Sequence, residues 1–528
     1  MGLTAAGAVP ALGLAPEAAA TGKDGTVGNG GTVGNGGTVG NGGTVGKGGA
    51  SVGSGAAADA SLVFDPTAYT EQTISIKDTT GTAHSVTYRF FKVASYVAAP
   101  VNAAYQSLNV SVPVSIDGTA VDASDAPILF ANAVGGYMPS SVANATGISA
   151  SGMGGGTSRQ GLALAAGYVV VEPGARGRSL VDANGTYYGT APAAIVDLKA
   201  AVRYLKFNKG RVPGDVERIV SSGVSAGGAL SALLGASGDS PLYDPYLAEI
   251  GAADTSDAIF ASGDWCPITD LEHADAAYEW CWGANPLASG ATVDATVSAD
   301  LKARFTDYLA SLKLRAKGYG ALTARNLDTY LLETFIQPSA TKYLAALTDT
   351  ARAAYLAANP FITWSAGKAG FTWADFLTHV GARKKNAPSF DGFDLSTPEC
   401  NLFGTGTTKA RHFTLYSLRH EAGDSARLDA DLPAKLHLMN PMYHLVDKVN
   451  PHRAKHWWIR LGTKDSDTSL SVAANLATRL TALGDDVDTA YYWDAGHGAD
   501  LDPGDFVSWI GEVSGHQGFR SRSGSRGK

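Results

Sequence analysis

The chain has 528 residues, of which 45% are hydrophobic and 17% are charged, and its formal net charge is −8. This composition is ordinary for a globular enzyme, and the length suits either two to four domains or one large α/β domain with an insertion. No basic stripe indicates a nucleic-acid partner, and no apolar run is long enough to span a bilayer.

Both ends of the chain lack the pattern of a folded domain. Residues 1–60 combine an Ala- and Leu-rich start, Leu3–Leu14, with four glycine-rich hexapeptides at 25–48. We expect the remnant of a signal peptide followed by a disordered linker, and hence a secreted or cell-surface protein. Residues 516–528 include the basic stretch Arg520–Lys528, which has no apolar residue and is expected to be a disordered tail.

Between these ends, short apolar runs alternate with helical patterns. The helix expected at Ala194–Lys206 places its apolar residues on one face, and a second helix is expected at Leu470–Leu483. This alternation predicts an α/β fold with a mostly parallel central sheet. Strands are expected at Ser85–Val93, Pro127–Ala131, Tyr168–Glu172, Ile219–Val220, Ala258–Ala261, His456–Leu461 and Val487–Trp493.

The alternation stops over residues 266–436. Helical patterns at Leu301–Ala310 and Ala340–Ala358 are joined there by long polar loops. A helical insertion between two strands is typical of a lid over the carboxyl ends of a parallel sheet. We therefore assign residues 61–265 and 437–515 to the core and residues 266–436 to a lid domain.

The stretch Gly223–Gly227 spells Gly-x-Ser-x-Gly, with Ser225 at its centre. An apolar run precedes it and a helical pattern of small residues follows. Strand, sharp turn and helix around a serine indicate a nucleophile elbow. A plain glycine-rich turn before a helix is the alternative.

A serine nucleophile needs a base, and the base needs an acid that orients it. Asp465 follows the expected strand at 456–461, and His497 follows the expected strand at 487–493. The order Ser225, Asp465, His497 is the order of the catalytic triad in the α/β-hydrolase fold. The alternative for His497 is a loop histidine that caps a neighbouring aspartate.

The developing oxyanion of an acyl-transfer reaction needs two hydrogen-bond donors. The N–H of Ala226, directly after the serine, supplies the first. The paired glycines after the strand at 127–131 favour Gly136 or its neighbour as the second, because glycine lets a backbone N–H approach a ligand closely. A simple tight turn remains the alternative there.

The sequence carries none of the patterns that indicate a metal or nucleotide enzyme. It contains no HExxH, no Cys/His pair at zinc spacing and no P-loop, so we expect a hydrolase without cofactor or metal. Three cysteines, Cys266, Cys281 and Cys400, exclude a disulfide framework. Cys266 and Cys281 are close enough in sequence to pair, which sequence alone does not decide.

Several stretches taken together resemble bacterial tannases of the secreted or cell-associated subtype, which are galloyl esterases of the α/β-hydrolase superfamily. The resemblance covers most of residues 60–515. The neighbours of the serine and histidine are Val224 and Gly496, so the disulfide-linked fungal subgroup does not fit. The resemblance rests on Val134–Met138, Glu172–Arg178, Gly223–Gly227, Cys266–Asp275, Asp394–Glu399, Asp465–Ser469 and the loop of His497.

The resemblance implies roles for three charged residues that spacing alone does not select. Lys385, Glu399 and Asp467 match the residues that hold the galloyl hydroxyls in such tannases. Lys384 adjoins Lys385 and is an alternative contact. For each of the three, a solvated surface charge is the alternative interpretation.

The function implied is hydrolysis of galloyl esters of hydrolysable tannins and simple gallates, through an acyl-enzyme on Ser225. The expected partner is a small galloyl ester or a tannin, and the oligomeric state is left open. Three alternatives remain at this point: a feruloyl or chlorogenate esterase, a serine peptidase of the α/β-hydrolase type, and a non-catalytic surface binding protein.

Overall fold

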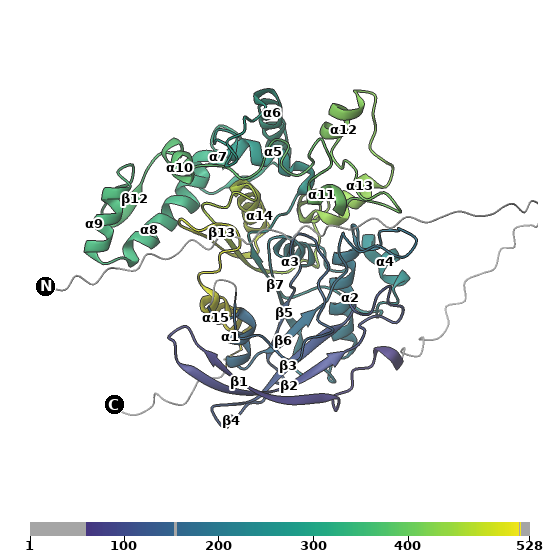
Figure 1. Cartoon of the computed structure of the whole chain (residues 1–528). Helices are drawn as coiled ribbons and strands as arrows, with labels where there is room; N and C mark the ends of the chain where they lie inside the picture. The colour runs from purple at the N-terminus through teal and green to yellow at the C-terminus, as the bar shows by residue number, and fades with distance from the viewer. Residues whose placement is uncertain (1–59, 153–155, 517, 519–528) are drawn as a thin grey trace, which may run out of the picture. The chain divides into compact units, whose positions relative to one another are not determined.

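A ten-stranded mixed sheet crosses the described part of the chain, which in this computed structural model comprises residues 60–152, 156–516 and 518 (Figure 1). The strand order is β1-β2-β3-β6-β5-β7-β8-β13-β14, with β4 paired to β3. The first pairs are antiparallel, and all pairs from β6 to β14 are parallel. The strands are β1 Tyr69–Lys77, β2 Ala83–Val93, β3 Leu108–Ile116, β4 Thr119–Ala120, β5 Pro127–Ala131, β6 Val169–Pro173, β7 Asp215–Val224, β8 Ala261–Trp265, β13 His456–Gly462 and β14 Asp486–Tyr492.

Helices cover both faces of this sheet, as an α/β fold requires. Helices α1 and α15 pack against each other on one face, while α2 and α3 pack together on the other (Figure 1). Every residue of α3 is buried, which its composition of Ala, Gly, Leu and Ser permits because small side chains allow close packing. The helices of the sheet region are α1 Arg159–Ala165, α2 Ala193–Phe207, α3 Ala226–Ala236, α4 Asp244–Glu249, α14 Leu470–Ala482 and α15 Pro503–Ser514.

A long helical insertion separates β8 from β13, as the sequence predicts. It also holds two short hairpins, β9/β10 and β11/β12. The insertion lies beyond the carboxyl ends of the parallel strands (Figure 1). Its elements are α5 Leu271–Trp282, α6 Ala295–Leu312, β9 Arg315–Ala316, β10 Gly320–Ala321, α7 Leu327–Leu331, α8 Gln337–Ala346, α9 Asp349–Ala358, β11 Thr363–Ser365, β12 Lys368–Gly370, α10 Trp373–Val380, α11 Pro398–Leu402, α12 Leu415–Ala422 and α13 Leu432–Met439.

Two expected elements differ from the structure. The strand expected at Ala258–Ala261 begins only at Ala261, because the residues before it form the loop that carries the buried Asp257. The single helix expected at Ala340–Ala358 is two helices, α8 and α9. Leu347 and Thr348 are extended between them, and the Thr348 hydroxyl caps α9. A threonine that caps a new helix interrupts an apolar period that would otherwise continue.

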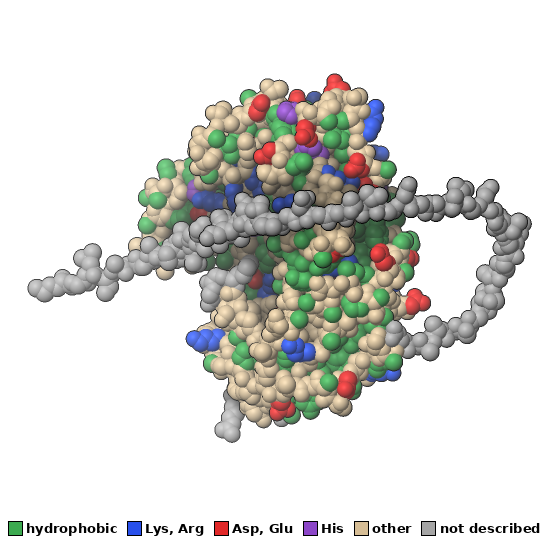
Figure 2. Space-filling view, turned by 45° about the vertical axis from the view of Figure 1, so that its right-hand side comes forward, with side chains coloured by type: hydrophobic (Ala, Val, Ile, Leu, Met, Phe, Trp, Pro, Cys, Tyr) green, Lys and Arg blue, Asp and Glu red, His purple; other side chains and the backbone are tan. Residues whose placement is uncertain are grey.

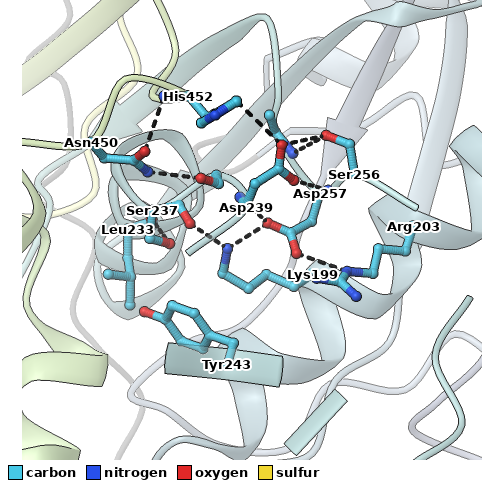
Figure 3. A network of polar contacts seen from close by, with 12 residues as sticks. Lys199, Arg203, Leu233, Ser237, Asp239, Tyr243, Ser256, Asp257, Asn450 and His452 are labelled. Atoms are coloured by element: carbon cyan, nitrogen blue, oxygen red, sulfur yellow. Dashed lines mark hydrogen bonds and ion pairs between the residues drawn. The ribbon is translucent and has the colours of Figure 1, made fainter. Parts of the chain in front are cut away.

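A buried polar network ties the end of α3 to its surroundings (Figure 3). Lys199 on α2 is fully buried, and its Nζ donates to the Ser237 carbonyl and to Asp257, each at 2.7 Å. Arg203 donates to the other carboxylate oxygen of Asp257 at 2.9 Å. Asn450, ahead of β13, donates to the Gly238 carbonyl at 2.8 Å. Four segments that are distant in the sequence are thereby held together beneath the nucleophile helix.

Several sequence-based expectations concern residues outside the described ones: the leader and hexapeptides within residues 1–59, and the basic stretch Arg520–Lys528. The three cysteines are buried free thiols, so Cys266 and Cys281 are not joined. Within the described ranges, no helix combines the length and apolarity that crossing a membrane requires. Over the lower part of the face in Figure 2, lysine and arginine side chains are scattered singly among acidic and hydrophobic ones.

Candidate active site

Ser225 lies at the apex of a sharp turn between β7 and α3. Its backbone is in a strained conformation, with φ of 61° and ψ of −121°. The turn is tight enough that a Cβ on Gly223 would lie 2.1 Å from the Gly227 carbonyl oxygen, and a Cβ on Gly227 would lie 2.6 Å from that of Val134. The strand, the two glycines and the helix therefore form a nucleophile elbow that projects the serine hydroxyl.

Ser225, His497 and Asp465 form one chain of hydrogen bonds. Ser225 Oγ lies 2.8 Å from His497 Nε2, and His497 Nδ1 lies 2.9 Å from Asp465 Oδ2. Asp465 is fully buried, and its other oxygen accepts the backbone N–H of Asp467 at 2.9 Å. The three side chains follow β7, β13 and β14, whose carboxyl ends meet at the same edge of the sheet. The structure thus brings together the three residues that the sequence selects.

The Asp465 carboxylate controls the protonation of His497. Burial disfavours the charged imidazolium, but the interactions of the ring with Asp465 and with Cys266 outweigh this cost and raise the pKa of His497 above its ordinary value. Because the carboxylate accepts a hydrogen bond from the N–H at Nδ1, Nε2 is the unprotonated nitrogen that faces the serine as an acceptor. This arrangement suits a general base for Ser225.

The loop after β5 lies against the turn that carries Ser225, since a Cβ on Gly227 would lie 2.6 Å from the Val134 carbonyl oxygen. Gly136 and Tyr137 both have positive φ, at 55°. Arg178 holds this loop, since its backbone N–H donates to the Tyr137 carbonyl and its Nε donates to the Gly136 carbonyl, at 2.9 and 2.8 Å. Within the described ranges, no protein acceptor takes the N–H of Gly136 or of Ala226. Both predicted oxyanion donors are therefore free for a ligand, and Ala226 also begins helix α3.

Asn132, at the end of β5, is a structural support of this site that sequence reasoning missed. Its Nδ2 donates to the carbonyls of Ser222 and Gly227, each at 3.1 Å, and its Oδ1 accepts the N–H of Val134 at 3.3 Å. The side chain therefore braces the nucleophile elbow against the oxyanion loop. Its position between a buried strand and paired glycines is the only sequence signal for this role.

Lys385, Glu399 and Asp467 come together above the triad. Lys385 and Glu399 lie in the insertion, whereas Asp467 follows β13, yet Lys385 interacts electrostatically with both carboxylates. Asp467 also interacts with His497. Burial alone would raise the pKa of Asp467, but His497 and the two lysines of the insertion hold it below its ordinary value. A patch with two carboxylates and an ammonium thus adjoins His497.

Glu399 is the member of this patch with an unused acceptor. It is buried with 7% of its surface exposed, and no described residue donates a hydrogen bond to its Oε2. Burial raises the pKa of Glu399, and the charges of Lys385 and Arg178 only partly oppose that shift. A buried acceptor without a partner costs stability unless a ligand supplies the missing hydrogen bond. Glu399 is therefore suited to bind a hydroxyl.

Comparisons with known proteins agree with this geometry. A family model described as BD-FAE, an α/β-hydrolase-type domain, matches residues 150–297. The solved structure of Fusobacterium nucleatum tannase is 37% identical, over 86% of this chain and 100% of that chain, with a TM-score of 0.73. The native tannin acyl hydrolase from Lactobacillus plantarum is 36% identical, over 86% and 99% of the two chains, with a TM-score of 0.74. A tannin acyl hydrolase in complex with ethyl gallate is 37% identical over the same shares, with a TM-score of 0.74. No match was found among curated proteins.

Proposed function

This chain belongs to the tannase (tannin acyl hydrolase) family, and we propose that it hydrolyses galloyl esters with Ser225 as nucleophile, His497 as general base and Asp465 as the acid that orients the base. The observation that carries the mechanism is the unbroken chain of hydrogen bonds from Ser225 through His497 to the buried Asp465.

The reaction follows from the positions of these atoms. His497 Nε2 takes the Ser225 proton as Oγ attacks the ester carbonyl, and the resulting oxyanion accepts hydrogen bonds from the N–H groups of Ala226 and Gly136. Protonated His497 then donates its proton to the departing alcohol, which leaves an acyl-enzyme on Ser225. A water molecule, deprotonated by His497, attacks this ester and releases gallate.

The patch above the triad supplies the preference for a galloyl group. A galloyl ring carries three adjacent hydroxyls, each of which can donate and accept hydrogen bonds. Glu399 and Asp467 accept from these hydroxyls, and Lys385 donates to them. A related tannin acyl hydrolase has been solved with ethyl gallate bound. Because unpaired buried groups are costly, such a site discriminates strongly against esters that lack the hydroxyls.

The test of the nucleophile is gallate release from methyl gallate by the purified full chain. Ser225→Ala removes the attacking atom, so turnover should fall by about 10⁶-fold, to the level that binding and the oxyanion donors sustain alone. Ser508→Ala, a substitution of an exposed serine on α15, is the matched control and should retain full activity. Substantial hydrolysis by Ser225→Ala would contradict the assignment.

The remaining esterase and peptidase alternatives differ in the acyl group. A ferulate has an acrylic spacer and fewer ring hydroxyls than a gallate, and an aminoacyl anilide has neither feature. Comparing kcat/KM for methyl gallate, methyl ferulate and an aminoacyl anilide separates these classes. We expect methyl gallate to be preferred, and a preference for either other substrate would overturn the assignment of the acyl group.

A further inference from the structure

A cysteine thiol with no role in the mechanism above lies beside the general base. Cys266 directly follows β8, is buried and has a positive φ of 37°. Its Sγ lies 4.0 Å from His497 Nε2, the nitrogen that accepts the Ser225 proton. Because a thiolate and an imidazole nitrogen are both good ligands for soft cations, the pair has the chemistry of a metal site.

The positions of the donor atoms define which of them an ion would contact. Ser225 Oγ is 2.8 Å from Nε2, so Oγ and Sγ both lie near this nitrogen. With ordinary Zn–S and Zn–N bond lengths, a tetrahedral Zn²⁺ ion holds its two ligand atoms about 3.6 Å apart, so a side-chain shift of about 0.4 Å from the observed 4.0 Å brings both into range. Water would complete a tetrahedral shell.

Asp465 also belongs to this group, whose donor atoms lie within 4.8 Å of one another, but its carboxylate is already hydrogen-bonded to His497 Nδ1. Its Oδ2 lies 2.9 Å from His497 Nδ1 and accepts the hydrogen bond of that ring N–H. Zinc-binding histidines characteristically donate their second ring N–H to a carboxylate, which fixes the tautomer and makes the ligating nitrogen more basic. The triad therefore already supplies the outer hydrogen bond that such a site requires.

A second cluster of the same residue types has no ring nitrogen available to bind an ion. Asp391, Cys400 and His412 also gather within the insertion. There, however, both ring nitrogens of His412 face carboxylates, Asp391 at 2.7 Å and Glu421 at 2.9 Å. His412 has no nitrogen left for an ion. His497 differs in two respects. Its Nε2 faces the Cys266 thiol as well as the Ser225 hydroxyl, and 24% of its side chain is exposed.

We propose that Cys266 Sγ and His497 Nε2 bind a soft divalent cation such as Zn²⁺ or Cd²⁺, and that the bound ion switches off ester hydrolysis. On binding, the metal–sulfur bond forms and the thiol proton leaves to solvent. The ion also occupies the Nε2 lone pair, so His497 no longer accepts the Ser225 proton. Inhibition in this form rests on the proposed role of His497, whereas ion binding does not. Mg²⁺ and Ca²⁺ prefer oxygen ligands and should not inhibit.

Binding is tested first, by equilibrium dialysis of ⁶⁵Zn²⁺ against the full chain carrying Ser225→Ala. This variant has no turnover to measure, so the result does not depend on the catalytic assignment. Adding Cys266→Ala or Cys266→Ser should weaken the binding of the tightest ion by about tenfold or more, because a ligand is lost. Cys400→Ala, in the second cluster, is the matched control and should leave that binding unchanged.

Inhibition is tested next, with p-nitrophenyl acetate as substrate because it lacks the adjacent hydroxyls that chelate metals. Zn²⁺ should inhibit the unmodified chain reversibly, and EDTA should restore the rate. Each variant is compared with its own rate without ion. Cys266→Ala and Cys266→Ser should need about tenfold more Zn²⁺ for half inhibition, and Cys400→Ala should behave as the unmodified chain does.

Two results would overturn the proposal: equal Zn²⁺ affinity with and without Cys266, or equal sensitivity of the Cys266 variants and the unmodified chain to Zn²⁺. If the unmodified chain is inactive but still binds Zn²⁺ through Cys266, the catalytic assignment is contradicted and the metal site is supported. Circular dichroism of both Cys266 variants confirms that a lost effect is not a lost fold.

Discussion

Lys384 and Asp467 form an ion pair in which Nζ lies 2.7 Å from Oδ1. The Lys384 side chain is 54% exposed, so this pair orients Asp467 from the solvent side. Its neighbour Lys385 points elsewhere: its Nζ lies 3.7 Å from the centre of the Phe390 ring, and its charge acts on both Glu399 and Asp467. Of the two lysines that the sequence left as alternatives, Lys384 is paired with Asp467, and Lys385 is the one whose charge acts on both carboxylates.

This difference predicts unequal effects of removing the two lysines. Lys385→Ala should lower kcat/KM for methyl gallate by about 10- to 100-fold, because a charged hydrogen bond to the substrate is lost. Lys384→Ala should cost only a few-fold, since a pair with an exposed partner is worth little. Methyl benzoate, which has no ring hydroxyls, should be insensitive to both changes. A larger effect for Lys384→Ala would reverse the assignment.

The acid limb of the pH profile should report His497. The base must be neutral to act, and its hydrogen bond to the Asp465 carboxylate, with a further contribution from Cys266, raises the pKa of His497 above the ordinary 6.5. Activity should therefore rise with pH through a value above 6.5 and be lost as the pH falls below it. Asp465→Asn removes the carboxylate, so the limb should move to lower pH and kcat should fall by about 10⁴-fold.

The measurement for that prediction is kcat/KM for methyl gallate across pH, under anaerobic conditions that prevent gallate oxidation. Asp505→Asn, an exposed change on α15, should leave the profile in place. An Asp465→Asn profile that keeps the original limb would mean that another group controls the rate.

Arg178 should matter for the oxyanion and not only for substrate binding. Its Nε donates to the Gly136 carbonyl at 2.8 Å, and its Nη1 donates to Asn401 of α11 at 3.2 Å. Arg178→Lys loses this two-ended geometry, so the N–H of Gly136 becomes less well positioned. Because one oxyanion donor is worth about 10²- to 10³-fold, we expect kcat to fall by about tenfold or more.

An ester without ring hydroxyls separates the two roles of Arg178. If Arg178 positions the oxyanion loop, kcat for p-nitrophenyl acetate falls as it does for methyl gallate. If Arg178→Lys instead raises only KM for methyl gallate, Arg178 acts through its charge on Glu399 and not through the oxyanion loop. Arg211→Lys, at an exposed position, is the control.

The buried carboxyl of Asp264 should make the folded chain less stable as the pH rises. Burial raises the pKa of this β8 carboxyl from 3.8 to about 8, and the hydroxyls of Ser262, at 2.7 Å, and Ser231 oppose that shift only in part. The folded chain thus binds the proton more tightly than the unfolded chain. Its contribution to stability is complete below about pH 4 and is lost as the pH rises toward 8, by on the order of 5 kcal/mol.

Urea unfolding at pH 5, 7 and 9 tests this prediction. Asp264→Asn cannot ionise, so its free energy of unfolding should depend less on pH and should exceed that of the unmodified chain at pH 9. The buried Asp275, whose pKa is raised to about 7, leaves a residual slope of the same sign. An unchanged pH dependence in Asp264→Asn would contradict the expectation.

The buried ammonium of Lys199 should stabilise the chain strongly. Lys199→Met leaves the Asp257 carboxylate buried with Arg203 as its remaining cationic partner, which should lower the free energy of unfolding by about 3–5 kcal/mol. Lys209→Met breaks an exposed pair with Glu217 and should cost less than about 1 kcal/mol. Denaturant unfolding of both variants checks the contrast, and equal losses would refute it.

The sheet and the triad were readable in the sequence because their signals are local. Each strand that positions a catalytic residue is a short apolar run, and the turn at Ser225 needs glycine at two nearby positions. The order of Ser225, Asp465 and His497 then follows from strands whose carboxyl ends share one edge. The secreted location, the domain boundaries and the expectations for residues 1–59 remain predictions.

The split of the helix expected at 340–358 and the bracing by Asn132 were not readable in this way. Each depends on one hydrogen bond that competes with a regular local pattern. Helical periodicity does not reveal where a threonine hydroxyl such as that of Thr348 begins a new helix. Nor does composition reveal which carbonyls an asparagine reaches across a turn.

The sequence alone therefore determined the fold class and selected Ser225, Asp465 and His497, since these depend on periodicity and on order along the chain. Tertiary structure decided which lysine acts electrostatically on both Glu399 and Asp467, and that the Cys266 thiol lies beside His497. Residue 266 is separated from residue 497 by the whole insertion and β13, so no local pattern reports their contact. Such distances are set by how the insertion folds back over the sheet, and that packing is a property of the whole chain.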